Sequence, residues 1–299
     1  VLEPGGIIHG EDKAPECSIL EGFEKISLHP NEDSLAENAV LDHYTLLVQN
    51  DSGAEGALLE IPWLISCQPT LGSEEWDGVT APAIVRSETR TNDLLLVGGK
   101  EYAESIDSVR NCSGLILDIT DFPGLNDSEI EAMVISLRSR MDNSSIILLR
   151  GRIDRIERVF RLVMDLDLDG AVVICSTPSG SRLASSLPKI GLASKAMGIG
   201  ETGKFVMLEI DFEPQAKDML IAIASGCTAV VSPHMGGSVH SKIENLGREI
   251  RGWMRDIGVD RIDRIGRRNL RADDYDTAAI SGLRLVGYER PLKMWLELG

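Results

Sequence analysis

The chain has 299 residues, with 43% hydrophobic and 26% charged residues, which is the composition of a folded globular protein with one large domain or two ordinary ones. It carries 30 Lys plus Arg against 47 Asp plus Glu, a formal net charge of −17. Because a nucleic-acid-binding surface needs clustered positive charge, this balance argues against general nucleic-acid binding. No apolar run is long enough to cross a bilayer and the acidic start is unlike a signal peptide, so we expect a cytoplasmic protein without membrane contact.

The first 60 residues do not follow the pattern of the remainder and are predicted to form an N-terminal extension. From residue 61 on, eight short apolar runs alternate with longer amphipathic stretches. These candidate strands are Ile61–Ser66, Ala81–Val85, Leu94–Val97, Gly114–Ile119, Ser145–Arg150, Gly170–Cys175, Lys204–Ile210 and Thr228–Ser232. Near-continuous Val, Ile and Leu is typical of parallel strands that are covered on both faces.

Helices are predicted between most of these strands. One follows Asn126, with Ser128 and Glu131 as a capping box, and a second follows Asp154. A third is expected to begin at Pro214 and to stop at Gly226.

Eight strands with intervening helices favour an α/β fold, a (β/α)₈ TIM barrel, over an open doubly wound sheet. The expected division is an N-terminal extension over 1–60, a barrel over 61–240, and a C-terminal helix and tail over 241–299 that pack on the barrel.

In such a barrel the loops after the strands form the functional face. Arg150 closes the fifth strand, where a permanent cation could face a flavin or a phosphate, or could pair with nearby acids. The loop after the sixth strand offers Ser179, Gly180, Ser181 and Arg182 as an anion cradle, although an ordinary surface turn uses the same residue types.

Two further loops give opposite indications about phosphate binding. After the eighth strand, Gly236 and Gly237 stand where a phosphate-binding loop is expected, with His234 close by. After the seventh, Glu209, Asp211 and Glu213 present negative charge, which opposes phosphate binding. A divalent metal held by Glu209 and Asp211 is an alternative use of these carboxylates, with His234 as acid or base.

The five cysteines are widely separated and contain no CxxC pair, so they favour buried thiols over a local zinc site or an iron–sulfur cluster. They are Cys17, Cys67, Cys112, Cys175 and Cys227.

Several segments over roughly residues 61–290 resemble the FMN-binding barrel domain of glutamate synthase. In chain order they are IPWLIS, SIILLR, DLDGAVVICSTPSGSR, KFVMLEIDFEPQAKDMLIAIASGCTAVVSP and REIRGWMRDIGVDRIDRIGRRNL. The resemblance aligns Arg150 with a family lysine and places Gly180 and Ser181 in the family's glycine-rich loop. Where that family carries a Gly-Gly-Ile-Arg phosphate site, this chain has Asp211, Phe212, Glu213 and Pro214, and the family's cluster-binding cysteines have no counterpart.

The resemblance implies a divergent glutamate-synthase-type, FMN-type oxidoreductase barrel with an altered phosphate site and no iron–sulfur cluster of its own. It would bind FMN through Arg150, Ser179, Gly180, Ser181, Arg182, Gly236 and Gly237, with Arg150 stabilising the reduced ring. One alternative is a catalytically inactive barrel, a pseudoenzyme, that serves as a subunit or regulatory partner in a larger complex. The other is the metal-assisted enzyme.

Overall fold

The computed structural model describes residues 23–30, 44–46, 57–59, 61–66, 83–86, 93–98, 102, 114–120, 124–141, 146–175 and 183–288. The statements below concern these ranges.

Eight parallel strands form a closed barrel, in the order in which they follow one another along the chain. The last strand pairs with the first through Val231 and Leu64, which closes the cylinder. The predicted barrel and all eight predicted strands are therefore confirmed, with small shifts at their ends. The strands are β4 (Trp63–Ser66), β5 (Ala83–Val85), β6 (Leu94–Gly98), β7 (Gly114–Asp118), β8 (Ile146–Arg152), β9 (Gly170–Ile174), β10 (Phe205–Glu209) and β11 (Ala229–Ser232).

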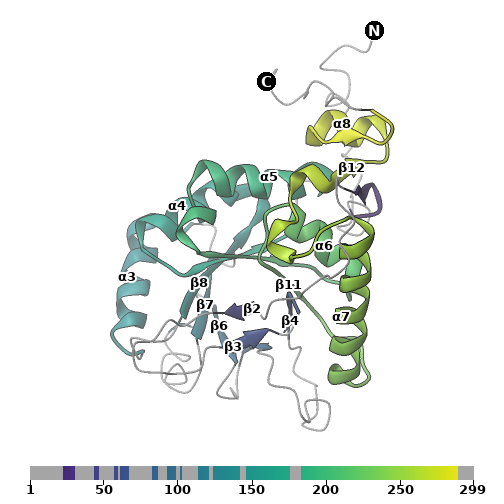
Figure 1. Ribbon diagram of the computed structural model, residues 1–299. Helices are drawn as coiled ribbons and strands as arrows, with labels where there is room; N and C mark the ends of the chain where they lie inside the picture. The colour runs from purple at the N-terminus through teal and green to yellow at the C-terminus, as the bar shows by residue number, and fades with distance from the viewer. Residues whose placement is uncertain are drawn as a thin grey trace, which may run out of the picture.

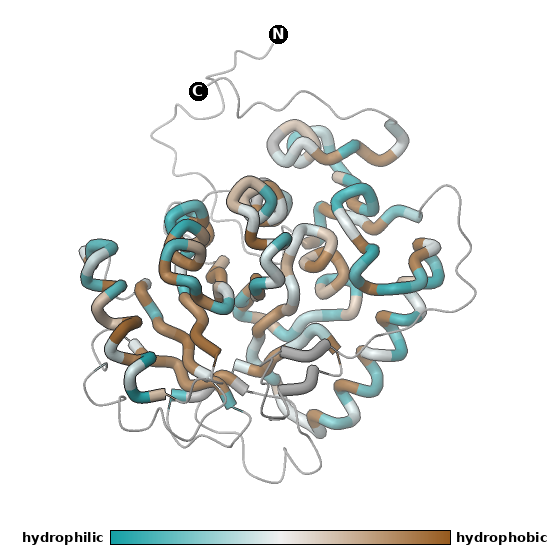
Figure 2. The backbone as a smooth tube through the Cα atoms, turned by 60° about the vertical axis from the view of Figure 1, so that its left-hand side comes forward, coloured by the Kyte–Doolittle hydropathy of each residue, from teal (hydrophilic) through white to brown (hydrophobic). Residues whose placement is uncertain are grey.

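The strands are buried on both faces because side chains alternate between two apolar clusters. An inner cluster fills the barrel and includes Ile116, Leu148 and Met207. The neighbouring residues Leu117 and Leu149 belong instead to an outer cluster, which lies between the strands and the helices. Hydrophobic colour accordingly concentrates along the strands in Figure 2, and hydrophilic segments are more frequent on the surrounding helices.

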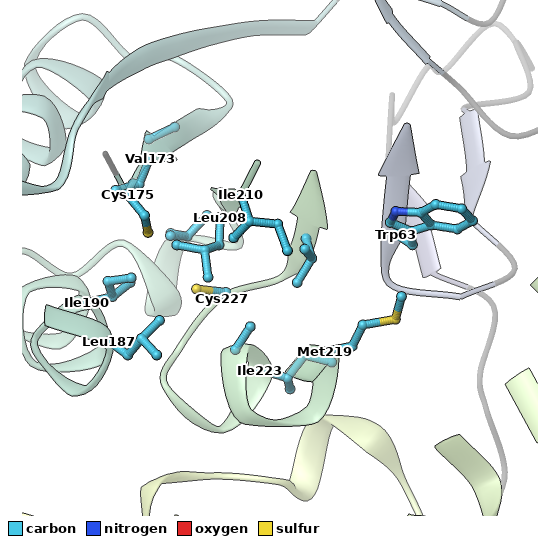
Figure 3. Close-up of a cluster of buried hydrophobic side chains, with 14 of the residues drawn as sticks. Trp63, Val173, Cys175, Leu187, Ile190, Leu208, Ile210, Met219, Ile223 and Cys227 are labelled. Carbon is cyan, nitrogen blue, oxygen red and sulfur yellow. The ribbon is translucent and has the colours of Figure 1, made fainter. Parts of the chain in front are cut away.

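The helices that follow β7 to β11 lie outside the strands (Figure 1). They are α3 (Asp127–Arg138), α4 (Ile156–Asp165), α5 (Leu183–Ala196), α6 (Ala216–Ala224) and α7 (Val239–Asp256), with short 3₁₀ turns at Ile153–Arg155, Gly200–Thr202, Ile262–Arg264 and Arg267–Asn269. Figure 3 shows how α5 and α6 pack against the barrel, where Leu187 and Ile190 meet Leu208 and the thiols of Cys175 and Cys227. Both cysteines are buried and free, as predicted for them.

A helix follows Asn126 as predicted, but its capping box lies two residues earlier in the sequence than predicted. Asn126 itself is the N-cap, and its side chain accepts a hydrogen bond from the backbone N–H of Glu129 at 2.9 Å. The Glu129 carboxylate accepts from the N–H of Asn126 in return, also at 2.9 Å. Ser128 and Glu131 therefore lie within the helix, because an asparagine N-cap satisfies the first turn two residues earlier.

The predicted third helix begins later than expected and ends as expected, with Gly226 just past its C-cap. Pro214 lies before the helix, since Gln215 is the N-cap of α6. Gly226 follows the C-cap with φ +97°, and a Cβ on it would lie 2.6 Å from the Cα of Gly191 in α5. Glycine is thus required there both by the backbone conformation and by the close approach of two segments.

Two smaller sheets accompany the barrel. β1 (Ile26–Leu28) pairs antiparallel with β12 (Leu270–Ala272), which pairs parallel with β13 (Arg284–Leu285), and β2 (Tyr44–Leu46) pairs with β3 (Ala57–Leu59). Figure 1 shows α8 (Tyr275–Ser281) close to β12 at the top of the view. The domain boundaries at residues 60 and 240 stay a prediction. None of the helices within the described ranges is long and apolar enough to cross a membrane.

Candidate functional site

Three charged side chains meet inside the barrel at the carboxyl ends of its strands. Asp118 ends β7, Arg150 lies near the end of β8, and Glu209 ends β10. The residues two positions earlier, Ile116, Leu148 and Met207, all belong to the inner cluster. Since the side-chain period of a strand is two, the three charged residues face the same interior. We call this group the mouth trio.

Arg150 joins the trio together. Its Nε and Nη2 donate to the two carboxylate oxygens of Glu209, each at 2.7 Å, and its Nη1 donates to Oδ2 of Asp118. The other oxygen of Asp118 accepts from the backbone N–H of Thr120 at 2.9 Å and from its hydroxyl at 2.6 Å. The planar guanidinium is therefore fixed by a fork on one side and by a second carboxylate on the other.

The trio is largely removed from water, with exposed side-chain fractions of 14% for Arg150, 0% for Asp118 and 18% for Glu209. Burial opposes the charge of Arg150, but the hydrogen bonds and charges of Glu209 and Asp118 outweigh burial and raise its pKa. One cation and two carboxylates leave a formal charge of −1 at the mouth.

The structure shows Arg150 as a partner of nearby acids, one of the two sequence interpretations; the other, a cation that faces a flavin or a phosphate, stays a prediction. Its catalytic role stays a prediction. Sequence reasoning missed Asp118, although a signal existed, because an aspartate that ends the buried run LILD must find a partner.

The three carboxylates of the β10 segment do not form one cluster. Glu209 faces the barrel interior, and Asp211 is exposed in the following bend. Glu213 contacts Nδ1 of His234 at 3.1 Å and the Lys242 ammonium at 3.4 Å. Among the described residues no group of three His, Cys, Asp or Glu side chains could hold a metal ion.

His234 is enclosed rather than presented to the mouth. Its side chain is 1% exposed, and Nε2 contacts the carbonyl oxygen of Gly237 at 3.0 Å while Nδ1 contacts Glu213. Its ring also lies edge-on to Trp63, with 6.1 Å between centroids. One ring nitrogen contacts Gly237 in the same loop and the other contacts Glu213 in the segment before α6, so His234 ties the two segments together and offers no acid or base to the metal-assisted alternative.

The β11–α7 loop has the backbone expected of an anion-binding turn. Gly236 and Gly237 have φ of +116° and +89°, and a Cβ added to either would meet nothing within 4 Å. Ser238 follows as the N-cap of the 18-residue helix α7, whose first turn contains no acidic residue. The loop's backbone therefore borders open space at a helix N-terminus, where amide N–H groups favour anions.

The remaining candidate residues Ser179, Gly180, Ser181 and Arg182 lie outside the described residues, as does Cys67. The cradle predicted after the sixth strand stays a prediction.

The geometry above places the chain among parallel (β/α)₈ barrels whose charged residues gather at the carboxyl ends of the strands. No family model matches the chain, and no curated protein matches it. Solved structures do match in fold. A flavocytochrome b2 variant superposes with a TM-score of 0.62 at 15% identity, covering 94% of this chain and 86% of that one.

Two oxidases give similar results. A lactate oxidase of Pediococcus acidilactici has a TM-score of 0.63 at 14% identity, covering 91% of this chain and 90% of that one. Mandelate oxidase with (S)-2-phenylpropionate has a TM-score of 0.57 at 14% identity, covering 84% and 88%. At such low identity the likeness concerns the fold, which is the TIM barrel of these flavoenzymes, and the specific resemblance to glutamate synthase stays a prediction.

Proposed function

We propose that the chain is an FMN-type oxidoreductase barrel. The observation that carries this proposal is Arg150, a permanent cation held at the mouth of a barrel that shares its fold with flavocytochrome b2 and hydroxy acid oxidases. The finer proposal follows the sequence resemblance: a divergent member of the glutamate-synthase type, without an iron–sulfur cluster of its own, that receives electrons from an external donor.

The mouth trio fits one edge of a flavin ring. A guanidinium has five N–H donors, and the hydrogen bonds to Asp118 and Glu209 use three of them. The other two have no partner among the described residues, so Arg150 retains a donor edge for a carbonyl or ring nitrogen of a ligand. The two carboxylates hold this edge in one orientation, which lowers the entropy lost when a ligand binds.

The phosphate of FMN fits one of the two neighbouring loops. The segment after β10 does not suit it, because Glu213 is committed to His234 and Lys242, and Asp218 occupies the start of α6 by accepting from the N–H of Gln215 at 2.9 Å. The β11–α7 loop suits it, since Gly236 and Gly237 expose backbone beside the α7 N-terminus. We therefore assign the phosphate to this second loop.

When bound, FMN would supply the redox chemistry. The chain's residues have positioning tasks: Arg150 donates hydrogen bonds toward the ring, Asp118 and Glu209 orient the guanidinium, and Gly236, Gly237 and Ser238 hold the anionic end. The two carboxylates outweigh the single cation, so the net formal charge of −1 on the mouth trio opposes the binding of negative charge.

A flavin titration tests the proposal. The purified chain is titrated with FMN and, separately, with riboflavin, which lacks the phosphate, while flavin fluorescence is followed. We expect saturable binding, tighter for FMN than for riboflavin, and we expect Gly237→Val to remove the difference between the two ligands. Arg255→Ala is the matched control, since Arg255 lies exposed in the last turn of α7 and far along the helix from its N-cap. Absence of saturable binding to folded protein would refute the proposal.

A second candidate function rests on the same trio. Because Arg150 is already neutralised by two carboxylates, the mouth is stable without a ligand, as expected for a barrel that acts as a subunit or regulatory partner in a larger complex. Native mass measurement of the protein in cell extract separates the candidates. A defined heteromeric complex without bound flavin would favour the subunit role, and a solitary flavin-loaded chain would exclude it.

A further inference from the structure

A second charged compartment lies beside the barrel mouth. It is a cavity of about 190 Å³ between the ends of β7 and β8 and the start of α4. Its lining residues are Ile119, Thr120, Gly151, Arg152, Asp154, Arg155, Arg158 and Val159. We call it the rim cavity.

The rim cavity is distinct from the mouth trio. Gly151 has the same strand parity as Leu149, which belongs to the outer cluster, whereas Arg150 points into the barrel. Val159 of α4 closes the cavity from the helix side, and a Cβ on Gly151 would lie 2.3 Å from its Cγ2. No residue of the mouth trio lines the rim cavity, although Thr120, which donates to Asp118, is one of its lining residues.

The lining of the rim cavity is basic although the chain is acidic. Three arginines against one aspartate give it a formal charge of +2, in a protein whose net charge is −17. Basic side chains held together against an acidic background create a local positive potential that attracts anions.

The three arginines differ in their commitments. Arg158 donates to Oδ1 of Asp127 from Nε at 3.0 Å and from Nη2 at 2.8 Å, and Arg152 lies 3.7 Å from Asp154. Arg155 is exposed, and no ion pair is formed by it within the part of the chain that the structure describes. Its charge is therefore available to a ligand in the cavity.

The backbone adds to this charge. Arg155 is the N-cap of α4, and its side chain makes no capping hydrogen bond. The N–H of Ile156 donates to the carbonyl of Ile153, so the positive dipole end of this helical segment lies at the 3₁₀ turn Ile153–Arg155, where it favours the same kind of ligand as the arginines.

We propose that the rim cavity is a binding site for a small oxyanion, the phosphate or carboxylate group of a low-molecular-weight ligand. Arginine's planar fork matches both groups, with Arg155 as the principal contact and Arg152 and Arg158 as flanking charges. At about 190 Å³ the cavity is smaller than the 300–1,000 Å³ typical of sites for whole drug-sized ligands, so it accommodates one anionic group rather than a nucleotide.

Calorimetric titration tests this site with two probes, inorganic phosphate and succinate. We expect saturable binding of at least one probe, weakened about tenfold by Arg155→Ala through loss of a charge-assisted hydrogen bond, and weakened further by added salt. Tighter binding of phosphate would assign the site to phosphorylated ligands, and tighter binding of succinate would assign it to carboxylates. Arg255→Ala removes the same charge from an exposed position on α7 and should leave the affinity unchanged.

Two results would overturn the proposal: no saturable binding of either probe, or equal weakening by Arg155→Ala and Arg255→Ala. The rim cavity does not depend on the proposed flavin site. Flavin titration of Arg155→Ala should match that of the unmodified chain, so a failure of either site is recognised separately.

Discussion

β8 carries arginines to two different environments within a few residues. Arg150 points into the barrel, where two carboxylates fix its guanidinium. Arg152 and the following Arg155 line the rim cavity, where arginine outnumbers aspartate. The mouth trio has an excess of negative charge and the rim cavity an excess of positive charge. The comparison shows that the charged groups around an arginine decide whether its charge can bind a ligand. Arginines that are close in sequence can differ in this respect.

The same comparison gives the two regions different physical roles. In the mouth trio the charges satisfy one another, so removal of one leaves another buried without a partner. In the rim cavity Arg155 is exposed, so its removal should change the free energy of unfolding little. The same removal should weaken ligand binding, because the ligand loses a contact. Substitutions at each place should therefore separate stability from binding.

The largest effect is expected for Arg150→Met. Asp118 is fully buried, and without Arg150 its carboxylate would keep only the bonds from Thr120. Breaking a buried ion pair by removing one partner typically costs 3–5 kcal/mol, and we expect a loss of about that size in the free energy of unfolding, measured in urea. Arg150→Lys should fall in between, since it keeps the charge and loses the fork. A loss below about 1 kcal/mol for Arg150→Met would show that the mouth is open to water.

Gly151→Ala tests the contact between β8 and α4 at the rim cavity. A Cβ at this position would lie 2.3 Å from Cγ2 of Val159, so α4 must shift or the valine must change rotamer. Overpacking of this kind costs about 1–3 kcal/mol, to be measured by thermal or urea unfolding. Gly151→Ala combined with Val159→Ala should recover part of the loss, because the smaller side chain restores the space. An unaffected single variant would mean that the contact between β8 and α4 is loose.

The fold could be predicted from the sequence because its signals are local and repeated. Most barrel strands are short runs rich in Val, Ile and Leu, and such a run can be recognised in the sequence without knowing what it contacts in the fold. The cap of α3 was harder, because Asn126 and Ser128 both suit an N-cap and only the geometry shows which carboxylate reaches back.

A smaller loss of stability is expected for Glu209→Gln. The amide keeps one acceptor for Arg150 and loses the other, which should reduce the free energy of unfolding by about 1.5 kcal/mol. The substitution also changes the formal charge of the mouth trio from −1 to zero, so flavin affinity should rise in the titration described above. If affinity falls instead, the carboxylate orients Arg150 for the ligand more than its charge opposes it. Asp211→Asn is the control, since Asp211 is exposed outside the trio.

The candidate site could be predicted only in part, for reasons of distance along the chain. Arg150 was identified by its place at a strand end, but its partners lie 32 and 59 residues away and depend on the barrel register. The rim cavity escaped prediction because Arg150 and Arg152 have the same strand parity and look equivalent in the sequence, although Arg150 joins the mouth trio and Arg152 lines the rim cavity. The sequence pattern predicts which face of its own strand a residue occupies. The register of the closed barrel decides which residues of different strands meet.

The smallest effect on stability is expected for Asp127→Asn. Asp127 pairs with Arg158, which lines the rim cavity, and with Arg161. A hydrogen bond from Arg158 lowers the pKa of Asp127 against a small opposing effect of burial, and the charges of Arg158 and Arg161 lower it further. A lowered folded pKa means that the carboxylate stabilises the fold above the ordinary aspartate pKa of about 3.9 and that this contribution is lost as pH falls through the folded value. Since the Asp127 side chain is 45% exposed, we expect the variant to lose less than about 1 kcal/mol at pH 7.

The difference between variant and unmodified chain should shrink when urea unfolding is repeated near pH 3. Asp127→Asn should also release Arg158 toward the rim cavity, so that phosphate or succinate binds severalfold more tightly although the fold is slightly weaker. Opposite signs for stability and affinity would establish that Asp127 competes with the ligand for Arg158. If stability and anion affinity both decrease in Asp127→Asn, Asp127 does not compete with the anion. It instead holds Arg158 in the position in which Arg158 binds the anion.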